Sequence, residues 1–182
     1  SAGVLLELAD PNAGHVYPIT DQLLDIFLGY AQNSLMFHNL GKGQFKNISG
    51  QYGPAASLKS VSRGCAAADF DRDGDLDIIV NNLDSTPLFL ENQSPGGNWL
   101  ELRIQDERGM PAYGARVQVN GESRTQVAEL YSSASFLSQS SAALHFGLGK
   151  DTQVKSIQVR WPDGSQREYK DIQINRQAIV KK

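Results

Sequence analysis

Nine residues near the middle of the chain read Asp69-Phe70-Asp71-Arg72-Asp73-Gly74-Asp75-Leu76-Asp77, and five of them are aspartates. Carboxylates this close repel one another strongly, so a loop that holds them together needs a cation. Calcium accepts about six to eight oxygen ligands at roughly 2.3–2.6 Å, and a loop can supply them from alternate positions while a glycine lets the chain turn sharply. The stretch therefore predicts a calcium-binding loop.

The spacing of the acidic residues indicates how the ion is held. Carboxylates stand at alternate positions from the first, the sixth position is Gly74, and the backbone carbonyl of Asp75 at the seventh is an expected ligand. Magnesium fits less well, because it requires a strict octahedron and usually keeps several waters. A bound ion would hold these carboxylates ionised, which favours a structural site over acid–base catalysis. The predicted metal residues are Asp69, Asp71, Asp73, Asp75 and Asp77.

The residues that flank the loop distinguish it from an EF-hand. An EF-hand carries a glutamate at its twelfth position, where this chain has Val80. Cys65-Ala66-Ala67-Ala68 leads into the loop and the β-branched run Ile78-Ile79-Val80 leaves it, so strands rather than helices are expected on both sides. The ion would clamp a turn between two strands.

The rest of the chain also has a β pattern. Apolar residues alternate or come in short runs between Gly, Asn, Asp, Ser and Pro, which is typical of an all-β chain with many turns. A single helix is considered, at residues 21–30, although Gly29 interrupts its apolar stripe. Strands are expected at residues 4–8, 35–39, 45–48, 66–70, 77–81, 88–91, 99–104, 115–119, 125–130, 143–146, 156–161, 166–169 and 178–180.

Composition and charge exclude several classes of partner. The net charge is -3, and the 17 basic residues are scattered rather than clustered, so the chain lacks the basic surface that nucleic acid requires. No apolar run reaches the roughly 18 residues that a membrane helix needs, so no membrane insertion is expected. The single cysteine, Cys65, has no Cys or His cluster near it and is interpreted as a buried apolar residue of a strand.

A domain boundary is predicted at Gln93-Ser94-Pro95-Gly96-Gly97-Asn98, a stretch without side chains suited to a core. It divides the chain into domains at residues 1–95 and 96–182. Within the first domain, residues 35–45 read as a strand, a Gly-rich turn and a strand, and residues 88–92 repeat the first half of that unit.

The first domain resembles a known repeat. Residues 39–45, followed by residues 62–82, look like the FG-GAP or VCBS repeat, the blade unit of integrin-type β-propellers. In that family a calcium loop joins the first two strands of each blade, and its acidic positions match those of residues 69–77. The resemblance thus implies a calcium-binding propeller blade.

The second domain is similar to the ASPIC/UnbV domain, which follows such repeats in the cartilage acidic protein family and its bacterial relatives. The matching stretches extend through the whole of residues 98–182 and include Gly114-Ala115-Arg116-Val117, Leu144-His145-Phe146-Gly147-Leu148-Gly149 and Val159-Arg160-Trp161-Pro162-Asp163-Gly164. The expected fold is therefore all-β: a partial β-propeller of fewer than two blades with its calcium loop, then a β-sandwich-like domain. A propeller needs about four or more blades to close, so either the chain is a fragment of a longer protein or its exposed strand edges pair with a second copy in a homodimer.

No catalytic constellation is evident. The three histidines are far apart in sequence, and the serines beside His145 lack the Gly-x-Ser-x-Gly elbow of a hydrolase. We therefore expect a non-enzymatic, calcium-binding interaction protein of adhesion type, secreted or at the cell surface (periplasmic or on the outer surface in a bacterium), with an unidentified protein or glycan partner.

Two alternatives remain open. One is a polysaccharide-active enzyme, of which this chain is an accessory domain or whose catalysis lies in the C-terminal domain. For such catalysis Asp106, Glu107, Glu122 and Glu129 are the only local candidate acids, without diagnostic spacing. The other is a carbohydrate-binding module that uses exposed aromatic side chains, for which Tyr113, Tyr131 and Phe136 are candidates.

Overall fold

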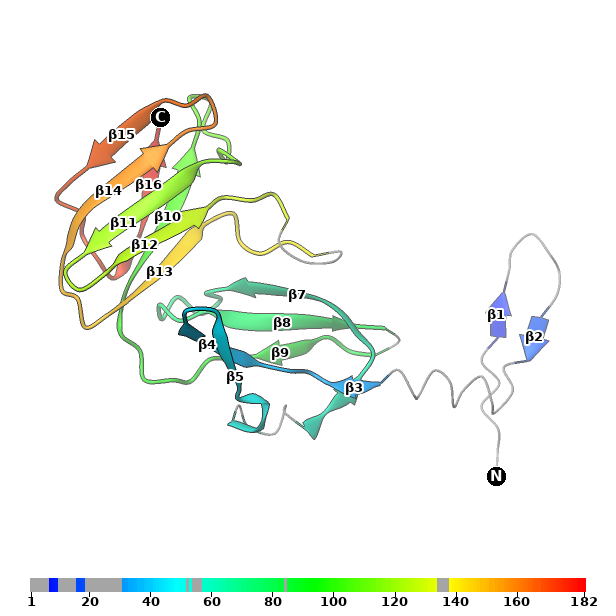
Figure 1. Cartoon of the computed structure of the whole chain (residues 1–182). Helices are drawn as coiled ribbons and strands as arrows, with labels where there is room; N and C mark the ends of the chain where they lie inside the picture. Colours follow the sequence, from blue (N-terminus) through cyan, green and yellow to red (C-terminus); the bar gives the residue numbers. More distant parts are fainter. Residues whose placement is uncertain are drawn as a thin grey trace. The chain divides into compact units, whose positions relative to one another are not determined.

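A computed structural model describes residues 7–9, 16–18, 31–51, 53, 57–83, 85–133 and 138–182 (Figure 1). These residues form strands and one short 3-10 turn, η1 (Ser49–Gln51), which confirms the prediction of an all-β fold. The helix considered at residues 21–30 lies outside the described residues.

The chain forms two compact units. The first contains residues 1–62 and 82–86, and the second contains residues 63–81 and 87–182. The acidic loop thus belongs to the same compact unit as the C-terminal domain. The domain boundary between residues 95 and 96 stays a prediction.

Among its described residues, the first unit contains three antiparallel strand pairs. They are β1 (Glu7–Ala9) with β2 (Val16–Pro18), β3 (Gln32–Asn33) with β6 (Lys59–Ser60), and β4 (Phe37–Gly41) with β5 (Gln44–Asn47).

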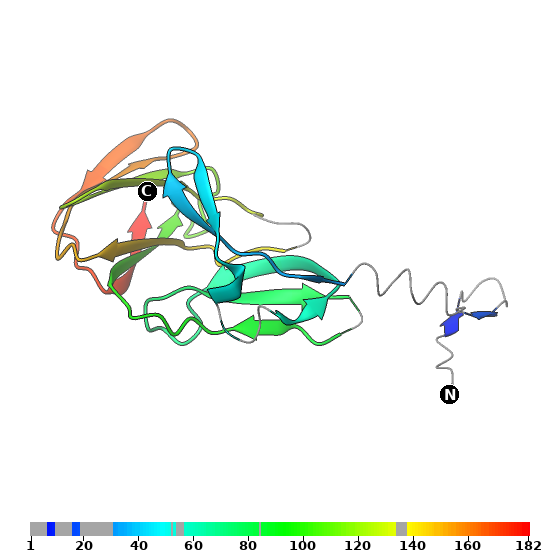
Figure 2. The same cartoon turned by 60° about the horizontal axis from the view of Figure 1, so that its bottom comes forward.

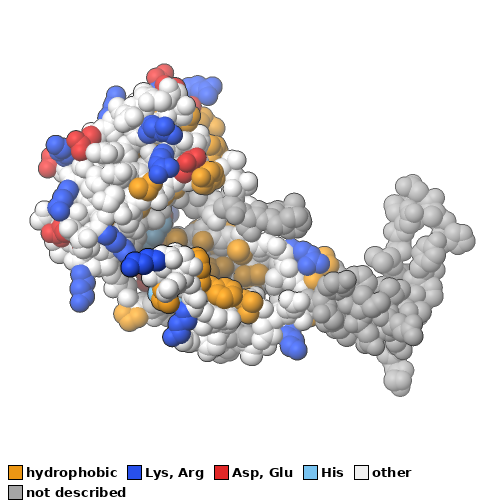
Figure 3. All heavy atoms as spheres, in the orientation of Figure 1, with side chains coloured by type: hydrophobic (Ala, Val, Ile, Leu, Met, Phe, Trp, Pro, Cys, Tyr) orange, Lys and Arg blue, Asp and Glu red, His pale blue; other side chains and the backbone are white. Residues whose placement is uncertain are grey.

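The hairpin of β4 and β5 turns through Gly41, Lys42 and Gly43, whose φ angles are 83°, 51° and 75°. Glycine adopts such angles without steric cost, which explains the Gly-rich turn seen in the sequence. Hydrophobic side chains reach the surface in this part of the chain (Figure 3), and Phe37 and Phe45 are 54% and 62% exposed.

The second unit begins with a three-stranded sheet in the order β7 (Ser62–Ala68), β8 (Asp77–Asn82) and β9 (Leu88–Leu90). The strand expected at residues 66–70 therefore ends two residues early, because Asp69 and Phe70 already belong to the loop. β9 pairs with β8 antiparallel, with Phe89 opposite Ile79.

The C-terminal domain consists of two sheets that lie as separate layers (Figure 2). In one, β10 (Asn98–Gln105) lies between β13 (Leu144–Gly149), which is antiparallel to it, and β16 (Arg176–Lys181), which is parallel. The other has the order β12 (Thr125–Glu129), β11 (Arg116–Gly121), β14 (Val154–Arg160) and β15 (Gln166–Tyr169), all antiparallel.

Alternating side chains from the two sheets form the core of this domain. A strand presents successive side chains to opposite faces, so every second residue of β10, β11 and β14 faces inward. The fully buried side chains of these strands include Leu100, Leu102, Ile104, Val117, Val119, Ile157 and Val159. The packing confirms the sandwich-like domain.

Candidate metal centre

The acidic loop connects two neighbouring strands of one sheet. β7 ends at Ala68 and β8 begins at Asp77, so residues 69–76 form the connection. Two of its residues have left-handed backbone angles, Arg72 with φ 67° and Gly74 with φ 99°. These angles coil the loop tightly enough to turn several of its carboxylates toward one point.

Three of the five predicted metal residues converge. Asp69, Asp71 and Asp77 each offer a carboxylate oxygen, and the three oxygens lie within 4.8 Å of one another. Asp77 is 3% exposed, so the most buried carboxylate of the group is shielded from water.

The other two aspartates lie outside this group. Asp73 accepts a hydrogen bond from the backbone N–H of Asp75 at 2.8 Å. The Asp75 carboxylate lies beside Gly96, 3.4 Å from where a Cβ on that glycine would stand. The assignment of all five residues as metal ligands stays a prediction.

Backbone N–H groups orient the converging carboxylates. Asp69 accepts from the N–H groups of Arg72 (2.7 Å) and Gly74 (3.0 Å), one to each oxygen. Asp77 accepts from Phe70 (3.1 Å) and Asn92 (2.9 Å), again one to each oxygen. A carboxylate oxygen has two lone-pair sites, so each can accept these bonds and still coordinate a cation.

The electrostatics of the loop favour a cation. The Asp73 N–H donates to Asp71 and acts to lower the pKa of Asp71, but desolvation and the charges of Asp73, Asp77 and Asp69 outweigh this bond and raise that pKa above its ordinary value. A divalent cation would reverse the repulsion. Hard carboxylate oxygens on a tight loop fit calcium.

Two features that the sequence did not indicate support the loop. A Cβ at Gly74 would overlap the indole of Trp99. The buried position 74 therefore requires glycine for this close contact as well as for its backbone angle. The edge strand β7 is bonded to the C-terminal domain, because Ala67 N–H donates to Ser140 Oγ (3.2 Å) and Ser141 N–H donates to the Ala67 carbonyl (3.3 Å). Both contacts join residues far apart in sequence, so the local spacing of residues does not indicate them.

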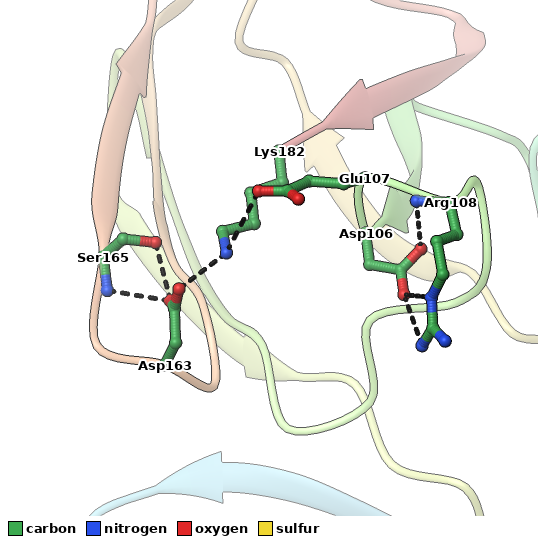
Figure 4. Close-up of polar contacts among 6 residues, drawn as sticks. All are labelled: Asp106, Glu107, Arg108, Asp163, Ser165 and Lys182. Carbon is green, nitrogen blue, oxygen red and sulfur yellow. Dashed lines mark hydrogen bonds and ion pairs between the residues drawn. The ribbon is translucent and has the colours of Figure 1, made fainter.

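The acids considered for catalysis have structural contacts. Asp106 accepts from the N–H groups of Met110 and Arg108, which lower its pKa. Figure 4 shows the bond from Arg108. Glu122 accepts from the N–H and hydroxyl of Thr152, which lower its pKa too. Glu107 lies 3.6 Å from the Lys182 ammonium (Figure 4), and Glu129 belongs to β12. A lowered pKa keeps Asp106 and Glu122 ionised, the reverse of what a general acid needs.

The aromatic candidates and histidines that the structure describes belong to different elements of the chain. Tyr131 is 62% exposed, while the Tyr113 hydroxyl accepts from Gln139 Nε2 at 3.2 Å. Phe136 and His15 lie outside the described residues. His38 belongs to β4 and His145 to β13. Cys65 is exposed on β7, so the prediction that it is buried is wrong.

The two halves of the chain match two known families. Residues 20–80 match the FG-GAP-like repeat, and residues 105–182 match the family described as ASPIC and UnbV. Both resemblances proposed from the sequence are thereby confirmed.

Within the described residues no helix is long and apolar enough to cross a membrane.

Curated relatives extend the comparison. The chain is 31% identical to cartilage acidic protein 1 of Homo sapiens and 30% identical to that of Mus musculus, over 156 residues and 79% of this chain in each case. It is 34% identical to the Xenopus tropicalis protein over 117 residues, 62% of this chain. The matched stretches span only 23%, 24% and 18% of these three relatives.

Proposed function

From the premise that the chain carries an FG-GAP-like repeat followed by an ASPIC and UnbV domain, we propose that it is a non-enzymatic, calcium-binding interaction protein of the extracellular space or cell surface. The observation that carries the calcium part is the convergence of Asp69, Asp71 and Asp77 within 4.8 Å at a loop between two strands. The extracellular assignment fits this site, because even a weak calcium site is occupied at millimolar calcium.

Calcium has a structural role in this proposal. Asp77 lies at the start of β8 and accepts from Asn92, which follows β9, while Asp69 follows β7. A cation shared by Asp69 and Asp77 would therefore tie all three strands of the sheet together. Partner binding would then depend on calcium, because calcium would keep the three strands of this sheet in place.

Calorimetric titration of the EGTA-treated, dialysed chain with calcium tests the proposal, with elemental analysis of bound metal alongside. We expect saturable binding of one ion and an increase in melting temperature. At a calcium concentration about 100 times the Kd the stabilisation amounts to about 2.7 kcal/mol.

The variant Asp69→Asn removes one charge from the converging group and is expected to weaken calcium binding strongly. Asp171→Asn is the matched control, since Asp171 is exposed, lies outside the loop and has a φ of 57° that asparagine tolerates. Equal calcium binding by both variants, or no calcium response of the unmodified chain, would contradict the proposed metal site.

A further inference from the structure

The outer face of the sheet formed by β13, β10 and β16 carries an unusual side chain. Leu100, Leu102 and Ile104 of β10 face the core, so Glu101 and Arg103 face the other way. An outward carboxylate would normally be solvated, yet Glu101 is only 7% exposed. Glu101 lies between His145 on β13 and Gln177 on β16, its partners on the two flanking strands.

The acidic loop lies along the same face of the sheet. A cleft of about 430 Å³ lies between the loop and this sheet face, and Asp69 and Arg72 of the loop line it together with Trp99, Glu101, Arg103 and Gln177 of the sheet. All of these residues belong to the second compact unit. The volume lies in the range of about 300–1,000 Å³ that is usual for ligand sites.

The floor of the cleft has unused hydrogen-bonding capacity. Gln177 of β16 donates to one oxygen of Glu101. His145, directly opposite Glu101 on β13, does not line the cleft but stacks on Trp99, with ring centroids 6.0 Å apart. Buried polar groups normally have hydrogen-bond partners, so a carboxylate with one amide partner favours a ligand that donates hydroxyls.

The rim of the cleft carries two arginines. Neither Arg72 nor Arg103 has a side-chain ion pair within the part of the chain that the structure describes. A guanidinium binds carboxylate or sulfate through two parallel N–H bonds. Asp69 is a proposed calcium ligand, so Glu101 is the carboxylate of the cleft lining that offsets the arginines, and a simple anion gains less net attraction. A ligand that combines an acidic group with hydroxyls satisfies both the rim and the floor.

We propose that this cleft binds an acidic saccharide unit, with its carboxylate or sulfate on Arg72 and Arg103, its hydroxyls on Glu101 and Gln177, and Trp99 as the apolar wall. This proposal rests on the interaction role proposed above and names the chemical class of the partner. The acid group can be a uronic carboxylate or a sulfate ester, since both offer the same paired oxygens to a guanidinium.

Isothermal titration of the full chain in calcium-containing buffer tests this cleft. The probes are a hyaluronan tetrasaccharide, which carries carboxylates only, a heparin tetrasaccharide, which also carries sulfates, and neutral chitotetraose. We expect saturable binding of at least one acidic probe and none of chitotetraose. The hyaluronan and heparin arms distinguish the two acid groups.

Arg103→Ala is expected to weaken that binding about tenfold or more, as the loss of a charge-assisted bidentate pair implies. Arg160→Ala is the matched control, because Arg160 is exposed on β14 of the opposite sheet and its replacement removes the same charge. Glu101→Gln should also weaken binding, and its thermal melting curve, compared with that of the unmodified chain, verifies folding.

Absence of binding to both acidic probes would overturn the cleft proposal, as would equal weakening by Arg103→Ala and Arg160→Ala. Calcium titration of the same samples separates the two proposals. Calcium binding without saccharide binding refutes only the cleft, whereas loss of the calcium response refutes the metal site.

Discussion

Replacement of Gly74 by alanine tests the packing of the acidic loop against the C-terminal domain. A φ of 99° costs a residue with a Cβ about 1–2 kcal/mol. The new Cβ would also overlap the Trp99 indole, and such overpacking typically costs about 1–3 kcal/mol more. We therefore expect Gly74→Ala to lower the free energy of unfolding by about 2–5 kcal/mol in urea denaturation at saturating calcium.

Gly164→Ala separates the two contributions. Gly164 has a similar φ of 88°, but a Cβ there would have no atom within 4 Å, so only the backbone cost of about 1–2 kcal/mol is expected. The difference between the two variants measures the contact with Trp99. If Gly74→Ala destabilises the chain no more than Gly164→Ala does, the indole is not packed against the loop and this reasoning fails.

Three further predictions concern the rest of the molecule. Leu102→Ala, at a fully buried site, should cost about 2–5 kcal/mol in urea denaturation, and the exposed Leu58→Ala should cost far less; similar losses would contradict the assigned core. The hydrogen bond from Lys182 to Asp163 (2.6 Å) and two bonds from Ser165 lower the pKa of Asp163 (Figure 4). The stabilisation by ionised Asp163 is therefore present above the unfolded pKa of 3.8 and is lost as the pH falls through the lower folded pKa. Asp163→Asn should reduce the melting temperature at pH 7 and leave it unchanged at low pH. An effect that does not depend on pH would exclude this ion pair as the cause. Light scattering after size exclusion should show a homodimer that pairs through exposed strand edges, as expected for the two-stranded sheets of the first unit, and a clean monomer would argue against it.

The local pattern predicts much of the β structure. The segments at residues 77–81, 99–104 and 166–169 correspond to β8, β10 and β15 within one or two residues, because alternation and β-branched residues are properties of each strand alone. The short strands β2, β3 and β6 were not predicted. They span only two or three residues each, too few for a period of two to be recognised.

The sequence by itself determined the all-β class, the two resemblances and the position of the acidic loop, since the spacing of aspartates around Gly74 is a local property. Only the tertiary structure decided which carboxylates converge, Asp69, Asp71 and Asp77, because Asp77 is held by Asn92 at 15 positions further along. It also decided that Trp99 packs on the loop and that Glu101 lines one cleft with the loop. These contacts join residues distant in sequence, and the paired strands and packed sheets, rather than any local spacing, bring them together.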